Sequence, residues 1–139
     1  MDSKGQISLE YLLLVFVSIL IIGSVTIPLI GKSIDASNDI SKASDAKVAV
    51  QSMANAADIV YANGPGAKRT ITFYMPNNGG IGFNNSKIYI TVTYSNGTTD
   101  NIEAKTQYNK IEIDRTALIK GWHTATIKWE GNKVKISIL

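Results

Sequence analysis

Residues 4–31 have the sequence KGQISLEYLLLVFVSILIIGSVTIPLIG. From residue 11 to residue 31 no side chain is charged, and a helix of about 21 residues rises about 30 Å, the thickness of the hydrocarbon core of a bilayer. The sequence therefore predicts a membrane-length helix near the N-terminus, with residues 6–31 as its apolar segment.

The residues that flank the apolar segment differ from those of a secretory signal peptide. A secretory signal has its small-residue cleavage site after an apolar core of about 7–15 residues. Here the small residue Gly5 precedes the core, and no Ala-x-Ala pattern follows the core directly. Cleavage between Gly5 and Gln6 would leave the apolar helix as the new N-terminus. Residues 1–5, which are short and polar, are therefore predicted to be a leader.

This N-terminal segment resembles the class III signal peptide of archaeal type IV pilin-like proteins. Lys4 and Gly5 precede the cleavage site, and Gln6, Ser8 and Glu10 follow it at the spacing of that family, ahead of the apolar run. The resemblance implies cleavage by a prepilin peptidase, extraction from the membrane by an assembly ATPase and a membrane platform protein, and assembly into a helical homopolymer. It implies no cofactor.

Glu10 is an acid at the start of a lipid-spanning segment, where a buried charge costs about 2.5–3.5 kcal/mol and calls for a partner. Cleavage would create a positively charged α-amino group on Gln6. The resemblance implies that Glu10 neutralises the amino terminus of a neighbouring subunit and so sets the axial register of assembly. An intramolecular contact with Gln6, one helical turn away, is also possible, and the alternative to both is a Glu10 that extends to the lipid headgroups.

Pro28 is the predicted weak point of the apolar helix. Proline has no backbone N–H and its ring crowds the carbonyl four residues earlier, here that of Ser24, so a kink is expected. The small residues Gly23, Ser24 and Gly31 would let neighbouring helices approach closely. The alternative is the ordinary tolerance of membrane helices for glycine and proline.

After Lys32 an apolar stripe with polar residues on the other faces predicts that the helix continues to residue 63. The stripe comprises Ile34, Ile40, Ala43, Val48, Val50, Met53, Ala54, Ala57 and Val60. Asp35, Asp39 and Asp45 are interpreted as a solvated helix face and not as a metal site. The sequence Asn-Gly-Pro-Gly at 63–66 predicts the end of the helix.

From residue 67 the apolar period changes to two, which indicates strands. The predicted strands are residues 70–75, 87–94, 100–105, 108–114, 122–129 and 133–139. Hairpin turns are expected at 96–97 and 130–132 and a further turn at 78–79, and the glycine-rich residues 79–82 are expected to form a flexible loop. The predicted fold class is α+β: a long N-terminal helix over 6–63, then a small antiparallel β-sheet or β-sandwich head over 67–139 packed on the upper half of the helix.

Composition and motifs give no support for catalysis. The chain has no cysteine, which excludes disulfides and thiolate metal sites, and the net charge of +3 is scattered without the basic block typical of nucleic-acid binding. The single histidine, His123, is expected to be a packed or edge residue. We therefore expect a protein that is not an enzyme, with no catalytic residues, no metal and no cofactor.

Two N-glycosylation acceptor patterns, at Asn84 and Asn96, fall in predicted turns. The predicted function is that of a pilin, a subunit of a type IV pilus-like filament that attaches cells to surfaces. The protein would be a single-pass membrane precursor and then an extracellular filament. The alternatives are a signal-anchored extracellular β-domain that binds a ligand and never polymerises, and a minor or priming pilin-like subunit.

Overall fold

The computed structural model describes residues 3–139, which form one helix and eight strands. The elements are α1 (Ser3–Asn63), β1 (Lys68–Met75), β2 (Gly79–Asn84), β3 (Lys87–Thr93), β4 (Thr99–Lys105), β5 (Ile111–Ile113), β6 (Ala117–Leu118), β7 (Gly121–Glu130) and β8 (Lys133–Ile138). This is the predicted α+β class, with the β-rich part packed on the helix. The chain divides into two compact units at residues 37 and 38, and each is described by itself.

The helix α1 begins at Ser3, ahead of the predicted start at Gln6. Once a helix is nucleated, each further residue adds one hydrogen bond, so polar residues beside an apolar run can extend it. The backbone therefore has no break at the bond between Gly5 and Gln6. At the other end α1 stops at Asn63 as predicted, and Gly64 adopts the left-handed conformation that favours glycine, with φ of 81°.

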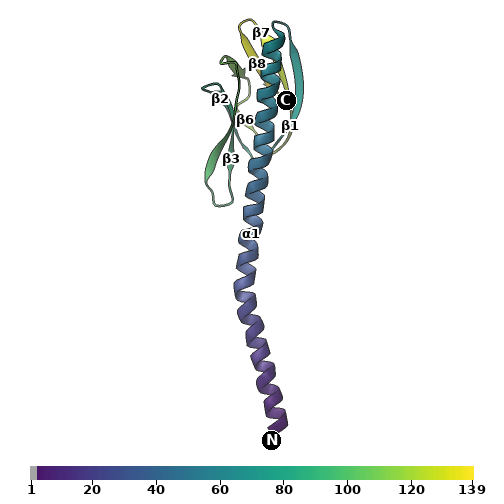
Figure 1. Ribbon diagram of the computed structural model, residues 1–139, viewed down its shortest axis with the longest axis vertical. Coiled ribbons are helices and arrows are strands. Elements are labelled where there is room, and N and C mark those ends of the chain that lie inside the picture. Colours follow the sequence, from purple (N-terminus) through teal and green to yellow (C-terminus); the bar gives the residue numbers. More distant parts are fainter. Residues whose placement is uncertain (1–2) are drawn as a thin grey trace. The chain divides into compact units, whose positions relative to one another are not determined.

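The strands form two four-stranded sheets, in the orders β1-β7-β8-β5 and β4-β3-β2-β6. All neighbouring strands are antiparallel except β5 and β8, which are parallel. Figure 1 shows β2 and β3 on one side of the upper part of α1 and β1 on the other. The helix residues from 38 onward therefore lie between the two sheets.

Both predicted hairpins are confirmed. Gly97, at φ of 82°, lies in the β3–β4 turn, which the backbone N–H of Tyr94 closes by donating to the carbonyl of Thr98 at 2.9 Å. Gly131, at φ of 62°, lies in the β7–β8 turn. The register across that hairpin pairs Ala125 with Ile138, Ile127 with Ile136 and Trp129 with Val134, which places these predicted facing residues opposite one another.

The prediction of a flexible loop at 79–82 was wrong, because these residues begin strand β2. Glycine lacks a Cβ, so its backbone can approach neighbouring atoms closely. A Cβ on Gly82 would lie 2.5 Å from the hydroxyl of Tyr89, and one on Gly79 would lie 2.6 Å from the carbonyl oxygen of Thr91. The glycines therefore serve close packing against β3. The two-residue strand β6 had no signal in the sequence.

The core is formed by the buried face of α1 and by the side chains that the two sheets direct toward it. The helix contributes mostly small residues, which let both sheets approach it; they are Ala46, Ala49, Val50, Met53, Ala54, Ala56, Ala57 and Val60. The strands contribute larger aliphatic side chains such as Ile88, Ile90, Ile127 and Ile136. Three members of the predicted stripe, Ile34, Ile40 and Val48, are exposed, because the buried face follows the positions of Val50, Met53, Ala57 and Val60.

Candidate functional site

The N-terminal unit presents a continuous apolar surface on all sides of α1. Every large hydrophobic side chain between residues 7 and 30 is exposed, from 39% for Val15 to 72% for Ile27. Among the described residues this is the one helix long and apolar enough to cross a membrane, with a mean hydropathy of 2.7 over its most apolar window. Exposed apolar surface of this extent requires cover from lipid or from other chains.

The predicted processing and assembly residues lie in the first turns of α1. Ser8 and Glu10 are exposed, and a Cβ built on Gly5 meets no other heavy atom within 4 Å. The side chains of Lys4 and Gln6 lie outside those that the structure describes. Residues 6 and 10 are four apart in a continuous helix, so they fall on the same face. Glu10 is thus an accessible carboxyl group near the start of an apolar surface, while the role of each residue in this motif stays a prediction.

Pro28 lies inside α1, which continues past it. The nearby hydroxyls hydrogen-bond to backbone carbonyls of the preceding turn: Thr26 donates to Ile22 at 2.7 Å and Ser24 to Ile21 at 2.8 Å. Neither hydroxyl reaches the carbonyl of Ser24, which Pro28 leaves without its helical donor. The predicted kink stays a prediction.

Gly23 and Gly31 leave open space on the helix, since a Cβ on either would meet no atom within 4 Å. Such positions allow a neighbouring helix to approach closely.

The remaining sequence-predicted residues lie in the β-rich unit. His123 is half-buried against the ring of Phe73, with ring centroids 5.8 Å apart, and its Nε2 is 2.8 Å from the carbonyl oxygen of Ile119. Asn84 and Asn96 are both exposed. The Asn96 side-chain oxygen accepts hydrogen bonds from the backbone N–H and hydroxyl of Thr98, at 3.0 and 2.6 Å.

Sequence reasoning missed a set of polar contacts that attach α1 to the β3–β4 side of the unit. Lys47 Nζ donates to the carbonyl of Glu103 at 2.7 Å, and the Asp58 carboxylate accepts from the backbone N–H of Gln107 at 2.9 Å. Asp39, predicted to be solvated, accepts hydrogen bonds from Ser95. These partners are about 50 residues apart in the chain, so no local pattern could reveal them.

Comparison with known proteins identifies the N-terminal segment. A family model for the class III signal peptide matches residues 3–29. No curated protein and no solved structure matches the chain. The matched segment is the hallmark of archaeal type IV pilin-like proteins and implies processing by a prepilin peptidase. Together with the apolar helix it fits a membrane-anchored, pilin-like precursor.

Proposed function

We propose that this protein is a structural subunit of an archaeal type IV pilus-like filament. Cleavage between Gly5 and Gln6 frees the mature chain, an assembly ATPase and a platform protein transfer it from the bilayer, and its apolar helix packs with copies of itself in the filament core. The role is structural and not catalytic.

The observation that carries this proposal is the combination of a class III signal peptide at residues 3–29 with exposed apolar side chains over the same segment. Burial of apolar surface is worth about 25 cal/mol per Å², so each thousand Å² covered by neighbouring helices contributes roughly 25 kcal/mol before the costs of association. Glu10 supplies the one charge in this surface that can select a register, through the α-amino group of Gln6 in a neighbouring subunit.

The test is to express the full chain with Glu10→Gln, which removes the charge and keeps the shape. We expect this variant to be cleaved and to remain in the membrane, while wild-type protein is recovered in filaments sheared from cells. Ser18→Ala, within the same apolar segment, is the matched control and should assemble normally. Mass spectrometry of the N-terminal peptide checks cleavage in each fraction and shows whether Gln6 has cyclised.

Two outcomes would contradict the proposal. If wild-type protein stays in the membrane with residues 1–5 attached, in cells with an active prepilin peptidase, the protein is an anchored binding module and not a pilin. If Glu10→Gln enters filaments as well as the wild type does, Glu10 has no part in assembly.

We further propose that the filament attaches cells to surfaces and carries glycans at Asn84 and Asn96. Both asparagines are exposed, and each lies at or in a hairpin turn of the head. Glycopeptide mass spectrometry of sheared filaments checks occupancy, and Asn96→Gln should abolish the modification at that turn alone. Adhesion of cells that lack the protein, compared with complemented cells, tests attachment.

A further inference from the structure

Strand β1 has an open edge. It is the outer strand of its sheet and pairs with β7 alone. The backbone N–H of Trp129 donates to the carbonyl of Ala67 at 3.1 Å, which fixes the hydrogen-bonding phase of the ladder: Arg69, Ile71, Phe73 and Met75 direct their backbone groups toward β7. The intervening residues direct their N–H and C=O groups away from the sheet. These residues are Lys68, Thr70, Thr72 and Tyr74.

Strand β4, at one edge of the second sheet, differs from β1, because two of its outward-facing backbone groups have partners. Lys47 on α1 donates to the Glu103 carbonyl, and the Asn101 N–H donates to the Asp100 carboxylate at 2.8 Å. Just beyond β4, Asp58 on α1 accepts from the N–H of Gln107. Within residues 38–139 no hydrogen bond joins α1 to β1. An edge strand left in this state is a template for another strand.

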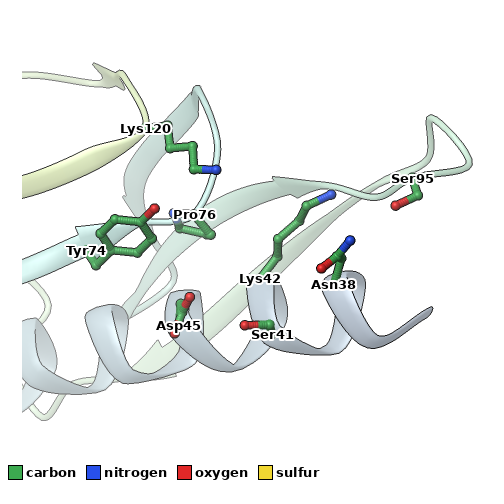
Figure 2. Close-up of a pocket in the computed structure, with 8 residues that line it drawn as sticks. All are labelled: Asn38, Ser41, Lys42, Asp45, Tyr74, Pro76, Ser95 and Lys120. Carbon is green, nitrogen blue, oxygen red and sulfur yellow. The ribbon is translucent and has the colours of Figure 1, made fainter. Parts of the chain in front are cut away.

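A groove runs along the seam between α1 and β1. Three hollows of about 350, 250 and 380 Å³ follow one another there. The first and second share Asp45 and Tyr74, and the second and third share Ser52 and Thr72, so the three hollows are adjacent along the seam; together they are here called the α1–β1 groove. Its helix side lies between residues 38 and 59 and its strand side between residues 69 and 76. Figure 2 shows the first hollow, with Asp45 on the helix near Tyr74 and with Lys42 extending from the helix toward the side of Ser95.

The α1–β1 groove has the dimensions of an extended peptide. Its strand side covers residues 69–76, which at about 3.3 Å per residue is about 25 Å, or seven to eight residues of a paired strand. The helix wall carries small residues such as Ser52 and Ala56 and the exposed apolar Val48, while Trp122, 73% exposed, stands beside the second hollow. Alternate side chains of a bound strand would contact these apolar residues, and its backbone would pair with β1.

The charged side chains that line the groove indicate which peptide sequences it would bind. Arg69 lines one end of the groove and Lys120 the other, and neither forms an ion pair within the part of the chain that the structure describes. Lys42 is already paired with Asp39, at 3.2 Å. The acid that lines the middle of the groove is Asp45. The two free cations at the ends favour a peptide with an acidic residue near each terminus.

We propose that the α1–β1 groove binds an extended acidic peptide strand of a partner protein, which adds to the open edge of β1. The backbone groups of Thr70, Thr72 and Tyr74 form the ladder, and Arg69 and Lys120 each pair with an acidic side chain of the peptide. This activity goes beyond filament formation and does not depend on it, because the groove lies wholly within Asn38–Leu139.

The test uses the full chain in detergent micelles and a fluorescent, end-capped peptide, Glu-Thr-Val-Thr-Val-Thr-Val-Glu, followed by anisotropy. Thr72→Pro removes one outward N–H at a strand edge, where proline is tolerated. It should weaken binding about tenfold, since it deletes a ladder hydrogen bond and blocks close approach. Thr72→Val keeps the N–H and should bind within about twofold of the wild type.

A second pair of variants keeps the test decisive if Thr72→Pro fails to fold by circular dichroism. Arg69→Glu combined with Lys120→Glu should lose the acidic peptide and gain the same peptide with lysine at both ends. The proposal is overturned if wild-type protein does not bind the acidic peptide, or if the charge-reversed protein still prefers it. It is also overturned if a folded Thr72→Pro protein binds normally, or if oligogalacturonate binds in the groove and displaces the peptide, since the site then serves acidic glycans.

Discussion

The Asp39 carboxylate on α1 accepts hydrogen bonds from both the backbone N–H and the hydroxyl of Ser95, each 2.9 Å long. Ser95 follows β3, in the turn that leads to β4. Lys42 Nζ donates to the same carboxylate at 3.2 Å and to the carbonyl of Thr93 at 3.4 Å. One acid on the helix therefore holds the tip of the β3–β4 hairpin.

Asp39→Ala should lower the melting temperature at neutral pH, because the backbone N–H and the hydroxyl of Ser95 both lose their acceptor. Partial burial raises the pKa of Asp39, but the hydrogen bonds from Ser95 and the charge of Lys42 outweigh it and lower the pKa below its ordinary value. A carboxyl whose pKa is lower in the folded state stabilises the fold above its unfolded pKa and loses that effect as pH falls through the folded pKa. The difference in melting temperature between Asp39→Ala and wild type should therefore shrink in acid.

The control for that experiment is Asp35→Ala. Asp35 is exposed on the same helix and accepts no hydrogen bond in the structure of residues 3–139. Its replacement should leave the melting temperature and its pH dependence unchanged. Equal effects of the two substitutions would show that helix charge, and not the bond to Ser95, stabilises this end of the unit.

Met53→Ala should destabilise the β-rich unit by about 2–5 kcal/mol, the usual cost of removing a large buried aliphatic side chain. Met53 is fully buried between the sheets. Val48, five residues earlier and 64% exposed, is the matched control, and Val48→Ala should change the free energy of unfolding by less than about 0.5 kcal/mol. Denaturant melts of both variants measure the difference. Similar losses would place the buried face of α1 elsewhere.

Gly79→Ala should cost about 1–3 kcal/mol, because the new Cβ would lie 2.6 Å from the backbone oxygen of Thr91, which cannot move without β3. Gly80→Ala is the control on the same strand, since its new Cβ would lie 3.6 Å from the nearest atom, an ordinary van der Waals contact. The second substitution should be close to neutral. A neutral Gly79→Ala would mean that β2 and β3 can separate locally.

Tyr61 on α1 stacks on Tyr108 and Trp129, with ring centroids 4.4 and 5.3 Å apart. Aromatic pairs contribute about 0.5–1.5 kcal/mol beyond their buried area, so a double-mutant cycle of Tyr61→Leu and Tyr108→Leu should show coupling of that size. Tyr74 makes an edge-to-face contact with Trp122 instead, so Tyr61→Leu and Tyr74→Leu should be additive. Additivity of the first pair would show that the stack has no energetic role.

Much of this architecture could be predicted because the deciding signals are local. The uncharged run, the Asn-Gly-Pro-Gly end of the helix and the alternation of Ala125, Ile127 and Trp129 each lie within a few residues. The class III signal is similarly local, so its residues could be named from the sequence and matched to a family. The structure adds that Glu10 is exposed within an apolar surface.

The parts that could not be predicted depend on distant neighbours. The glycines of β2 were predicted to form a flexible loop because the residues that they pack against, Thr91 and Tyr89 on β3, are not close to them in the sequence. The contacts of Asp39, Lys47 and Asp58 also join residues that are far apart in the sequence. The groove along β1 depends on the strand order, because only the complete sheet shows that one edge of β1 has no neighbouring strand.

The position of β8 has a consequence for biosynthesis. It is the last of the eight strands in sequence, yet it lies inside its sheet, between β7 and β5. Strand β1, the first in sequence, pairs only with β7 and so cannot pair until β7 has been synthesised. Pairings this distant in sequence form late. The sheet therefore cannot close before residues 133–138 have been synthesised, and until then the emerging chain exposes its apolar strands to chaperones and proteases.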